Sequence, residues 1–163
     1  MREYVAEAVV LDREPAGEYD SRVHFFTERY GKLIGRATSA RKITSKLSAH
    51  LEPGTLTKLR FVEQKGLRIT DSLTIKGRTG RVPDLHLLAR MLPEGEPELE
   101  LWALLRAEAF TWPKALGILG WDPDGSNCTI CGGRTQAFSA RFQEFFCGEH
   151  VGKLKAEEVV YMQ

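Results

Sequence analysis

The sequence predicts an α+β protein in which a small β-barrel precedes a helical region that ends in a metal-binding element. Three observations predict this order. The first 77 residues form short β-type segments separated by turn signals. From Pro83 onward, apolar residues recur every three or four positions, as on one face of a helix. All three cysteines lie in two short motifs within residues 126–152. We therefore expect two domains, residues 1–77 and 78–163.

The N-terminal region contains five candidate strands and one short helical insert. A turn-prone run from residue 12 to 20 follows the first strand, and two later pairs of strands are joined by turns in which Gly31 and Gly66 are expected to adopt a positive φ. Pro53 and Gly54 end the insert. The strands are predicted at 4–11, 23–27, 32–37, 55–63 and 67–75, and the helical turn at 45–51. This order matches the five-stranded oligonucleotide-binding (OB) fold, although an SH3-like barrel would give nearly the same pattern.

The region after the barrel is predicted to form three helices. The first begins near Pro83 and presents one apolar face, and a short acidic linker follows at residues 93–97. A second helix is expected to run through Thr111, and a third to cover residues 113–119. The apolar face of the second helix consists of Leu99, Trp102, Leu105, Ala109 and Trp112. We expect both tryptophans to lie in the core rather than to form a ligand platform.

Charge is distributed unevenly along the chain. Residues 1–81 carry 16 basic and 10 acidic side chains, a net charge of +6, whereas residues 82–163 carry 7 basic and 12 acidic side chains, a net charge of −5. The first half can therefore attract a polyanion that the second half repels. No apolar stretch has the length of a membrane helix, charged residues follow Met1, and three cysteines suit a reducing compartment. We expect a cytoplasmic protein.

Two motifs near the C-terminus predict a zinc site. Cys128 and Cys131 form a C-x-x-C pair, and after fifteen intervening residues Cys147 and His150 form a C-x-x-H pair. Zinc prefers four tetrahedral ligands from thiolate and imidazole groups, and a two-residue gap lets both donors of a pair reach one ion. Because four protein ligands leave no position for a catalytic water, we predict one structural Zn²⁺ ion, with a hairpin over residues 136–146. The alternatives are unused thiols, a redox C-x-x-C pair, and a zinc hydrolase that exchanges one ligand.

A basic run from residue 22 to 46 predicts a nucleic-acid surface, because it contains seven basic side chains and a single acid, Glu28. Lysine and arginine neutralise phosphates and release counterions, so binding would tolerate any sequence and weaken with salt. Tyr30 is the better candidate for stacking on a base, since at least one of the adjacent Phe25 and Phe26 must face the barrel core, and we expect one of these three rings to be exposed. The predicted DNA-binding residues are Arg22, Arg29, Tyr30, Lys32, Arg36, Arg41, Lys42 and Lys46. The alternative is an ordinary solvated face.

Two stretches of the sequence resemble the RecO family. Residues 26–33 (FTERYGKL) are similar to the turn after that family's second strand, and the segments 40–42 (ARK), 45–47 (SKL) and 50–53 (HLEP) continue its basic region. Residues 116–123 (LGILGWDP) and 128–132 (CTICG) resemble the approach to its zinc site. The resemblance covers residues 5–76 and 113–150 and is weak over the helices between them.

The resemblance implies a recombination mediator of DNA repair that consists of an OB domain, a helical domain and a zinc element. Such a protein binds single-stranded and duplex DNA, anneals complementary strands and assists recombinase loading, associated with the nucleoid. The family's partners are RecR, single-stranded-DNA-binding protein and RecA. Three departures stand out. Thr38 and Ser39 replace an arginine and a glycine, His150 replaces the more usual cysteine, and the helical region is shorter, which predicts a reduced groove for the acidic tail of single-stranded-DNA-binding protein.

Catalytic motifs are missing from the sequence. It has no glycine-rich phosphate loop with lysine, no G-x-G-x-x-G after a strand and no H-E-x-x-H. We therefore predict a protein that is not an enzyme. A second binding class stays open at this point, an RNA-binding OB and zinc-knuckle module of the translation or transcription machinery, which would use the 2′-hydroxyl group.

Overall fold

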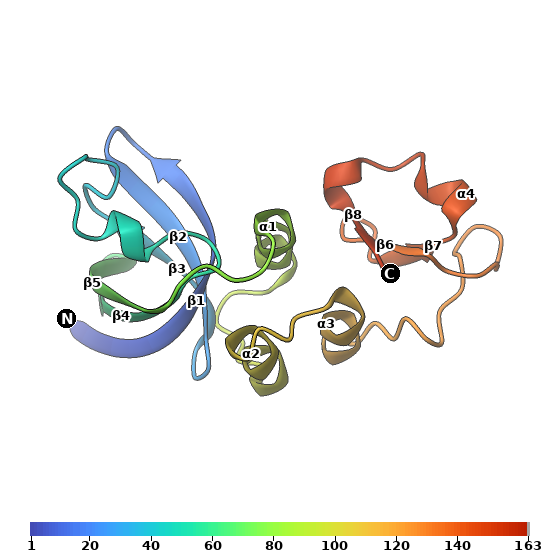
Figure 1. The fold of residues 1–163 in the computed structure, drawn as a ribbon, viewed down its shortest axis with the longest axis horizontal. Helices are drawn as coiled ribbons and strands as arrows, with labels where there is room; N and C mark the ends of the chain where they lie inside the picture. The colour runs from blue at the N-terminus through green and yellow to red at the C-terminus, as the bar shows by residue number, and fades with distance from the viewer. Residues whose placement is uncertain (163) are drawn as a thin grey trace. The chain divides into compact units, whose positions relative to one another are not determined.

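The computed structural model describes residues 1–162 and divides the chain into two compact units, with the boundary between Glu108 and Ala109. The first unit contains the barrel and two helices, and the second contains one longer helix, a small sheet and the cysteine motifs (Figure 1). The first compact unit therefore extends beyond the barrel domain predicted for residues 1–77. The predicted division into an OB domain of residues 1–77 and a domain of residues 78–163 stays a prediction.

Five strands of the first unit close a barrel in the order β1-β2-β3-β5-β4. All neighbouring strands are antiparallel except β3 and β5, which pair in parallel. The strands are β1 (Arg2–Ala16), β2 (Asp20–Thr27), β3 (Gly31–Ala37), β4 (Leu56–Glu63) and β5 (Leu67–Lys76), with a 3-10 helix (Ser48–His50) between β3 and β4. This closed five-stranded barrel confirms the predicted OB fold.

Strand β1 is longer than predicted, and the expected turn from residue 12 is wrong over its first half. The strand pairs with β4 over Arg2–Val9 and with β2 over Ala8–Ala16, with a bulge between Val10 and Asp12. Val10 still exchanges backbone hydrogen bonds with Gly54 and Thr55, just before β4, but beyond it the strand pairs with β2 alone, so the missing N–H group of Pro15 removes no bond to β4. The chain turns only at Gly17, where φ is 81°.

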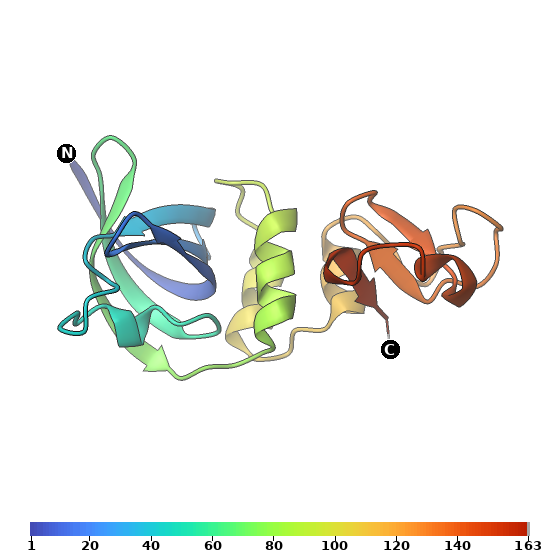
Figure 2. The ribbon, with the colours of Figure 1, turned by 90° about the horizontal axis from the view of Figure 1, so that it is seen from above.

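Strands β1 and β2 bury side chains on both of their faces, one toward the barrel interior and one toward helix α1 (Val82–Met91). Phe25 and Phe61 fill its interior together with smaller apolar side chains, while Val9 and Phe26, which are register partners, point away from the interior and are buried as well. They are buried because helix α1 packs against β1 and covers this side of the barrel (Figure 2). The adjacent Phe25 and Phe26 are therefore both fully buried, and neither can stack on a base. Tyr30 alone of the three rings keeps accessible surface, but it is half-buried, so the expectation of an exposed ring holds only in part.

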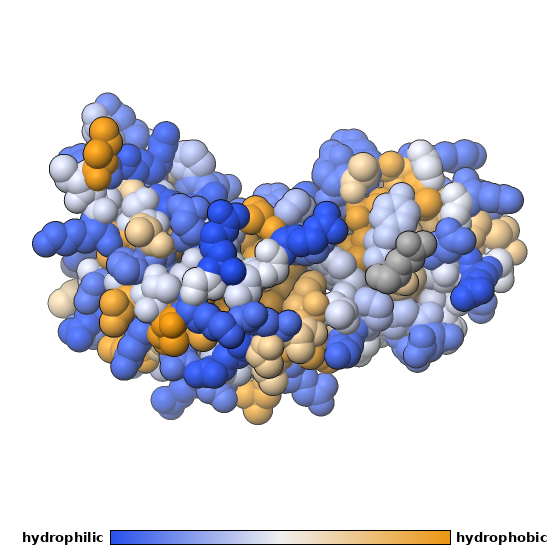
Figure 3. All heavy atoms as spheres, in the orientation of Figure 1, coloured by the Kyte–Doolittle hydropathy of each residue, from blue (hydrophilic) through white to orange (hydrophobic). Residues whose placement is uncertain are grey.

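Two further helices follow α1. Helix α2 (Leu99–Arg106) belongs to the first unit, and helix α3 (Trp112–Ile118) opens the second. The prediction that the second helix continues through Thr111 is wrong, because Glu108 adopts a positive φ of 56° and ends the helical backbone. Trp102 and Trp112 are both buried, as predicted. No helix among residues 1–162 is both long enough and apolar enough to span a bilayer, and hydrophilic residues cover most of the face drawn in Figure 3.

The second unit contains a three-stranded antiparallel sheet in the order β7-β6-β8. Strands β6 (Ala137–Ser139) and β7 (Glu144–Phe146) form the predicted hairpin, whereas β8 (Val159–Tyr161) was not predicted. A four-residue helix α4 (Gly148–Val151) follows β7, and a 3-10 helix (Ala156–Glu158) precedes β8. The apolar cluster beside α4 is small, with Ala137, Phe146 and Val151 as its buried members. The cysteine motifs flank this hairpin.

Candidate metal centre and nucleic-acid interface

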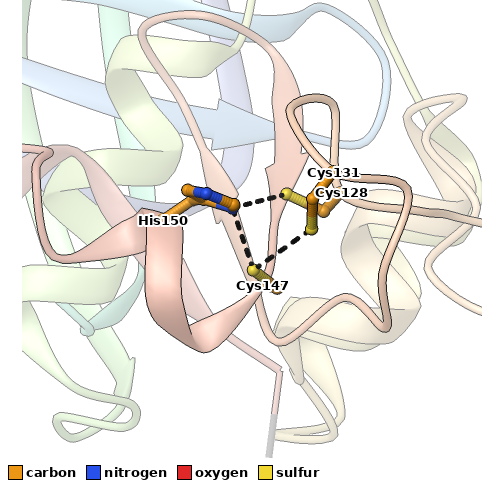
Figure 4. A group of neighbouring side chains, drawn as sticks. All are labelled: Cys128, Cys131, Cys147 and His150. Atoms are coloured by element: carbon orange, nitrogen blue, oxygen red, sulfur yellow. Dashed lines mark hydrogen bonds between the residues drawn. The ribbon is translucent and has the colours of Figure 1, made fainter.

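Four side chains of the second unit point toward one another (Figure 4). Their ligand atoms all lie within 4.8 Å of one another. His150 Nδ1 lies 3.2 Å from Cys147 Sγ and 3.5 Å from Cys128 Sγ, and Cys131 Sγ lies 3.8 Å from Cys147 Sγ. Metal–ligand bonds of about 2.0 to 2.3 Å place tetrahedral sulfur and nitrogen donors about 3.5 to 3.8 Å apart. The predicted set of Cys128, Cys131, Cys147 and His150 therefore has the spacing to hold a metal ion.

Local backbone structure explains how the first pair of cysteines turns toward the second. Gly132 N donates to Cys128 O at 2.8 Å, Cys128 N donates to Gly133 O at 2.9 Å, and Gly133 N donates to Cys131 Sγ at 3.4 Å. Gly132 has a φ of 72°, which a residue without a Cβ adopts easily. The second pair is simpler, since Cys147 precedes helix α4 and His150 lies within it. Three residues of separation at a helix start place both donors on one side.

The environment of the cluster favours a cation. Desolvation of Cys128 raises the pKa of its thiol, but the backbone N–H groups of Cys131, Cys147 and Ile130, helped by His150, outweigh it and lower the pKa to about 6. At Cys131 the N–H group of Gly133 lowers the pKa, yet desolvation and the neighbouring thiols raise it above its ordinary value. The cluster thus holds one thiolate readily, while a second negative charge needs a compensating ion.

A second candidate site is the basic loop, which we define as residues 38–47, between β3 and the first 3-10 helix. The loop contains no acidic residue, and Arg41, Lys42 and Lys46 are all exposed. None of these three forms a salt bridge with a residue that the structure describes. Lys42 Nζ instead lies 5.1 Å from the centre of the Tyr19 ring, and Arg41 Nη1 donates to Gly17 O at 3.0 Å. Ser39 N and Arg36 lower the pKa of Asp20 most, and Lys42 adds a weaker electrostatic interaction in the same direction. The basic loop therefore presents cations that no salt bridge neutralises.

Arg13 holds both ends of the basic loop and is the residue that sequence reasoning missed. Its Nη2 atom donates to Ala40 O at 3.1 Å, and its Nη1 atom donates to Ser48 O at 3.1 Å. Further bonds reach the side chains of Ser21, Ser48 and Glu52. The side chain of Arg13 is only 13% exposed. Residue 13 fell within the expected turn, where the sequence carries no signal for a buried guanidinium. This guanidinium fixes the loop against the barrel.

The predicted arginines on β2 and β3 are exposed but partly neutralised. Arg22 and Arg36 are register partners, yet Arg22 Nη1 lies 3.6 Å from Glu14 Oε1 and Arg36 Nη2 lies 2.6 Å from Asp20 Oδ2. A hydrogen bond from Ser39 N, together with Arg36, lowers the pKa of Asp20, so the acid is charged at neutral pH. Arg29 lies over the Tyr30 ring at 5.7 Å. Arg22 and Arg36 lie at the end of the β2–β3 hairpin from which the basic loop leaves, whereas Arg29 lies in the turn at the opposite end.

Lys32 requires a correction. We predicted that it contacts phosphate, but the residue is only 8% exposed and its Nζ atom donates to Ala89 O in helix α1 at 2.8 Å. Burial lowers the pKa of its ammonium group, and Glu94 opposes the shift. The side chain of Lys32 ties the barrel to the last turn of α1, where carbonyl groups lack helical donors. We therefore remove Lys32 from the DNA-binding surface.

The sequence is similar to known proteins across both units. A family described as "Recombination protein O N terminal" matches residues 1–77. A DNA repair protein RecO of Thermodesulfovibrio yellowstonii is 33% identical over 154 residues, which cover 78% of this chain and 62% of that protein. This chain is a relative of the RecO proteins. The RecO of Myxococcus xanthus is 30% identical over 160 residues, covering 82% of this chain and 65% of the relative.

A RecO of Syntrophobacter fumaroxidans is 29% identical and covers 77% of this chain and 60% of its own length. The chain thus spans 60% to 65% of the length of these RecO relatives. The match to the RecO N-terminal family ends at residue 77, where β5 has just closed the barrel. The resemblance to the RecO family that the sequence motifs indicated is confirmed.

Proposed function

We propose that this protein is a RecO-type recombination mediator of DNA repair, located in the cytoplasm at the nucleoid, with no enzymatic activity of its own. It binds single-stranded and duplex DNA, anneals complementary strands and assists the loading of a recombinase. RecR, single-stranded-DNA-binding protein and RecA are its proposed partners, on the strength of the relationship to RecO proteins. The observation that carries the DNA-binding proposal is the basic loop, whose three exposed cations form no salt bridge with a described residue.

The proposed contact is electrostatic. Arg41, Lys42 and Lys46 neutralise phosphates, and Arg22 and Arg36 extend the surface along β2 and β3. Arg29, in the turn at the far end of this hairpin, is its outermost proposed contact. Ile43 is fully exposed among the loop cations, so it supplies an apolar contact for a sugar or an unpaired base. Tyr30 is left out of this surface, because it lines an acidic pocket together with Glu63 and Glu94. The surface reads charge rather than sequence, as an annealing protein requires.

The hydrogen bonds from Arg13 to Ala40 O and Ser48 O support the same proposal. A loop of like charges repels itself and costs conformational entropy when a ligand orders it. Because Arg13 fixes the backbone near Ala40 and Ser48 before any ligand binds, part of that cost is met during folding. The free loop is thereby held in one place on the barrel, and the bound strand meets an organised surface.

For the metal centre we propose one structural Zn²⁺ ion. Three sulfur donors and one imidazole are a soft set that suits zinc and leaves no open coordination position. Such an ion stabilises a segment whose own apolar cluster is small. The imidazole of His150 replaces a thiolate without changing the tetrahedral preference, so the departure from the family pattern is compatible with this role.

Charge reversal in the basic loop tests the DNA-binding proposal. The double variant Arg41→Glu, Lys42→Glu should bind a single-stranded oligonucleotide more weakly, because two phosphate contacts are lost. The slope of log K against log salt should fall by about 1.4 in magnitude, at about 0.7 per contact for single strands. Fluorescence anisotropy at several salt concentrations measures both quantities.

The matched control carries the same change in net charge on exposed lysines of the second unit, Lys153→Glu and Lys155→Glu. It should keep most of the affinity and the full slope. Equal losses in the two variants would mean that only net charge matters, and the basic loop would no longer be the interface. An RNA oligonucleotide of the same sequence, titrated in parallel, tests the RNA-binding alternative.

A further inference from the structure

A pocket of about 480 Å³ opens on the first unit and takes no part in the proposed contact with DNA. Three aromatic rings, of Tyr4, Tyr30 and Phe61, line it together with two leucines. Two carboxylates, those of Glu63 and Glu94, complete the wall. None of the lining residues belongs to the basic loop. The volume is typical of a site that accepts a side chain or a small molecule.

The rings form a compact aromatic corner. Tyr4 and Phe61 are stacked, with centroids 5.3 Å apart and an angle of 17° between planes. Tyr30 meets Tyr4 edge-on at 5.4 Å and Phe61 edge-on at 6.4 Å. Phe61 is almost fully buried, whereas both tyrosines are half-buried and keep accessible surface. The faces of such rings carry negative electrostatic potential and attract cations.

The two carboxylates reinforce this potential. Both residues are exposed, and Tyr4 donates its hydroxyl hydrogen to Glu63 Oε2 at 3.3 Å. Within the described residues neither carboxylate lies within salt-bridge distance of a basic group. Three cations lie near this wall without a salt bridge to it. Arg2, the cross-strand partner of Glu63, interacts electrostatically with that carboxylate and with Tyr4, and Lys32 interacts in the same way with Glu94 while its Nζ atom donates to Ala89 O. Arg29 lies over the Tyr30 ring.

The acidic side of the pocket is held in place by the backbone. Glu94 belongs to the linker between α1 and α2, and this linker is fixed to β3 because Gly95 N donates to Lys32 O at 2.8 Å. Gly31 permits the close approach, since a Cβ at this position would collide with the backbone of Glu96. Its φ of 67° suits glycine as well. The carboxylate of Glu94 is therefore brought to the rings by the fold rather than by a mobile side chain alone.

We propose that this pocket binds an arginine side chain presented by a basic segment of a partner protein. A guanidinium group is planar, stacks on aromatic faces and pairs with carboxylates, so it uses both halves of the wall. A nucleic acid is disfavoured, because its phosphates would approach two exposed carboxylates that form no salt bridge with a described residue. The proposal is independent of the DNA-binding function, and either one can fail without the other.

Amide NMR spectra of the full ¹⁵N-labelled chain test the proposal with a defined probe. N-acetyl-arginine methylamide, titrated to millimolar concentration, should shift the amide signals of Tyr30, Leu67 and Gly95. The citrulline analogue has nearly the same shape without the charge, and it should bind about tenfold more weakly, since a cation on an aromatic and acidic wall contributes on the order of 1 to 2 kcal/mol. Equal shifts with both probes would overturn the proposal.

Variants localise the effect. The double variant Glu63→Gln, Glu94→Gln should lose the arginine response, while Glu96→Gln with Glu100→Gln, which neutralises two exposed acids outside the lining, should keep it. The spectra themselves report whether each variant folds. A thymidine oligonucleotide tests the alternative that the pocket binds nucleic-acid bases. Shifts of the pocket signals by this oligonucleotide, with none by the arginine probe, would show that the rings stack on bases and would overturn the proposal.

Discussion

With the proposed metal ion bound, the two units of the chain would be stabilised by different means. The first encloses large side chains such as Phe25, Leu59 and Phe61 inside a closed barrel, where each is almost fully buried. The second has short strands, a small apolar cluster beside α4 and four candidate ligand side chains that converge on one point. Burial of apolar surface is spread over many residues, whereas metal coordination depends on a few. Each unit should therefore respond to a different kind of damage.

Removal of the proposed metal ion should have the largest effect. The variant Cys128→Ser lacks one of four ligands, so it should lose the bound ion and unfold the second unit, since structural zinc contributes up to about 10 to 16 kcal/mol in small zinc domains. Elemental analysis measures the metal, and hydrogen exchange measures protection in each unit. The barrel amides should stay protected. A chelator added to the unaltered protein should give the same result.

Thr129→Ser, a conservative change between the two cysteines of the first pair, is the matched control and should keep the ion. Full protection of the β6 and β7 amides in metal-free protein would contradict the comparison, because the second unit would then be stable through its apolar cluster alone.

A cavity in the barrel core should damage only the first unit. Phe25→Ala removes a fully buried ring and should lower the free energy of unfolding of the barrel by about 3 to 5 kcal/mol. Metal content should not change, because no ligand belongs to the barrel. Chemical denaturation followed by hydrogen exchange separates the two units. Phe142→Ala, at a ring that is 52% exposed, should cost about 0.5 kcal/mol or less. Loss of metal in Phe25→Ala would show that the units unfold together.

The features that the sequence predicted correctly depend on residues close together in the chain. The four ligands lie in two pairs with two-residue gaps, so their convergence needs only a turn and a hairpin between them. The strands of the barrel were recognisable from β-type segments and from the turns at Gly31 and Gly66, both of which have positive φ. The order of strands then follows from the OB pattern, and β3 and β5 pair as this fold requires.

What the sequence did not predict depends on contacts between distant segments. Lys32 binds a carbonyl 57 residues away, and Arg13 reaches Ser48 across 35 residues. A charged residue in a basic run appears the same whether a helix later covers it or not. The continued strand β1 is similar, because only pairing with β2 shows that residues 12–16 are extended. Burial of a charge is decided by tertiary packing, on which local patterns are silent.

The smallest predicted effect separates two lysines of the same basic run. Lys32→Met removes the donor of a buried hydrogen bond and should lower stability by about 1 to 2 kcal/mol, since relief from burying an ammonium offsets part of the loss. Its affinity for DNA should not change. Lys42→Met, at an exposed position, should lower the affinity for DNA and leave the stability unchanged.

The buried ammonium group of Lys32 also predicts how the free energy of unfolding changes with pH. Because burial holds the pKa of its ammonium below 10.5, the unfolded chain binds more protons than the folded chain between the lowered pKa and 10.5. The stability of the unaltered protein should therefore rise with pH across that window relative to Lys32→Met, and urea denaturation at several alkaline pH values measures the difference. If Lys32→Met instead lost affinity for DNA and kept its full stability, Lys32 would belong to the DNA-binding surface after all. The contrast between buried Lys32 and exposed Lys42 would then be wrong.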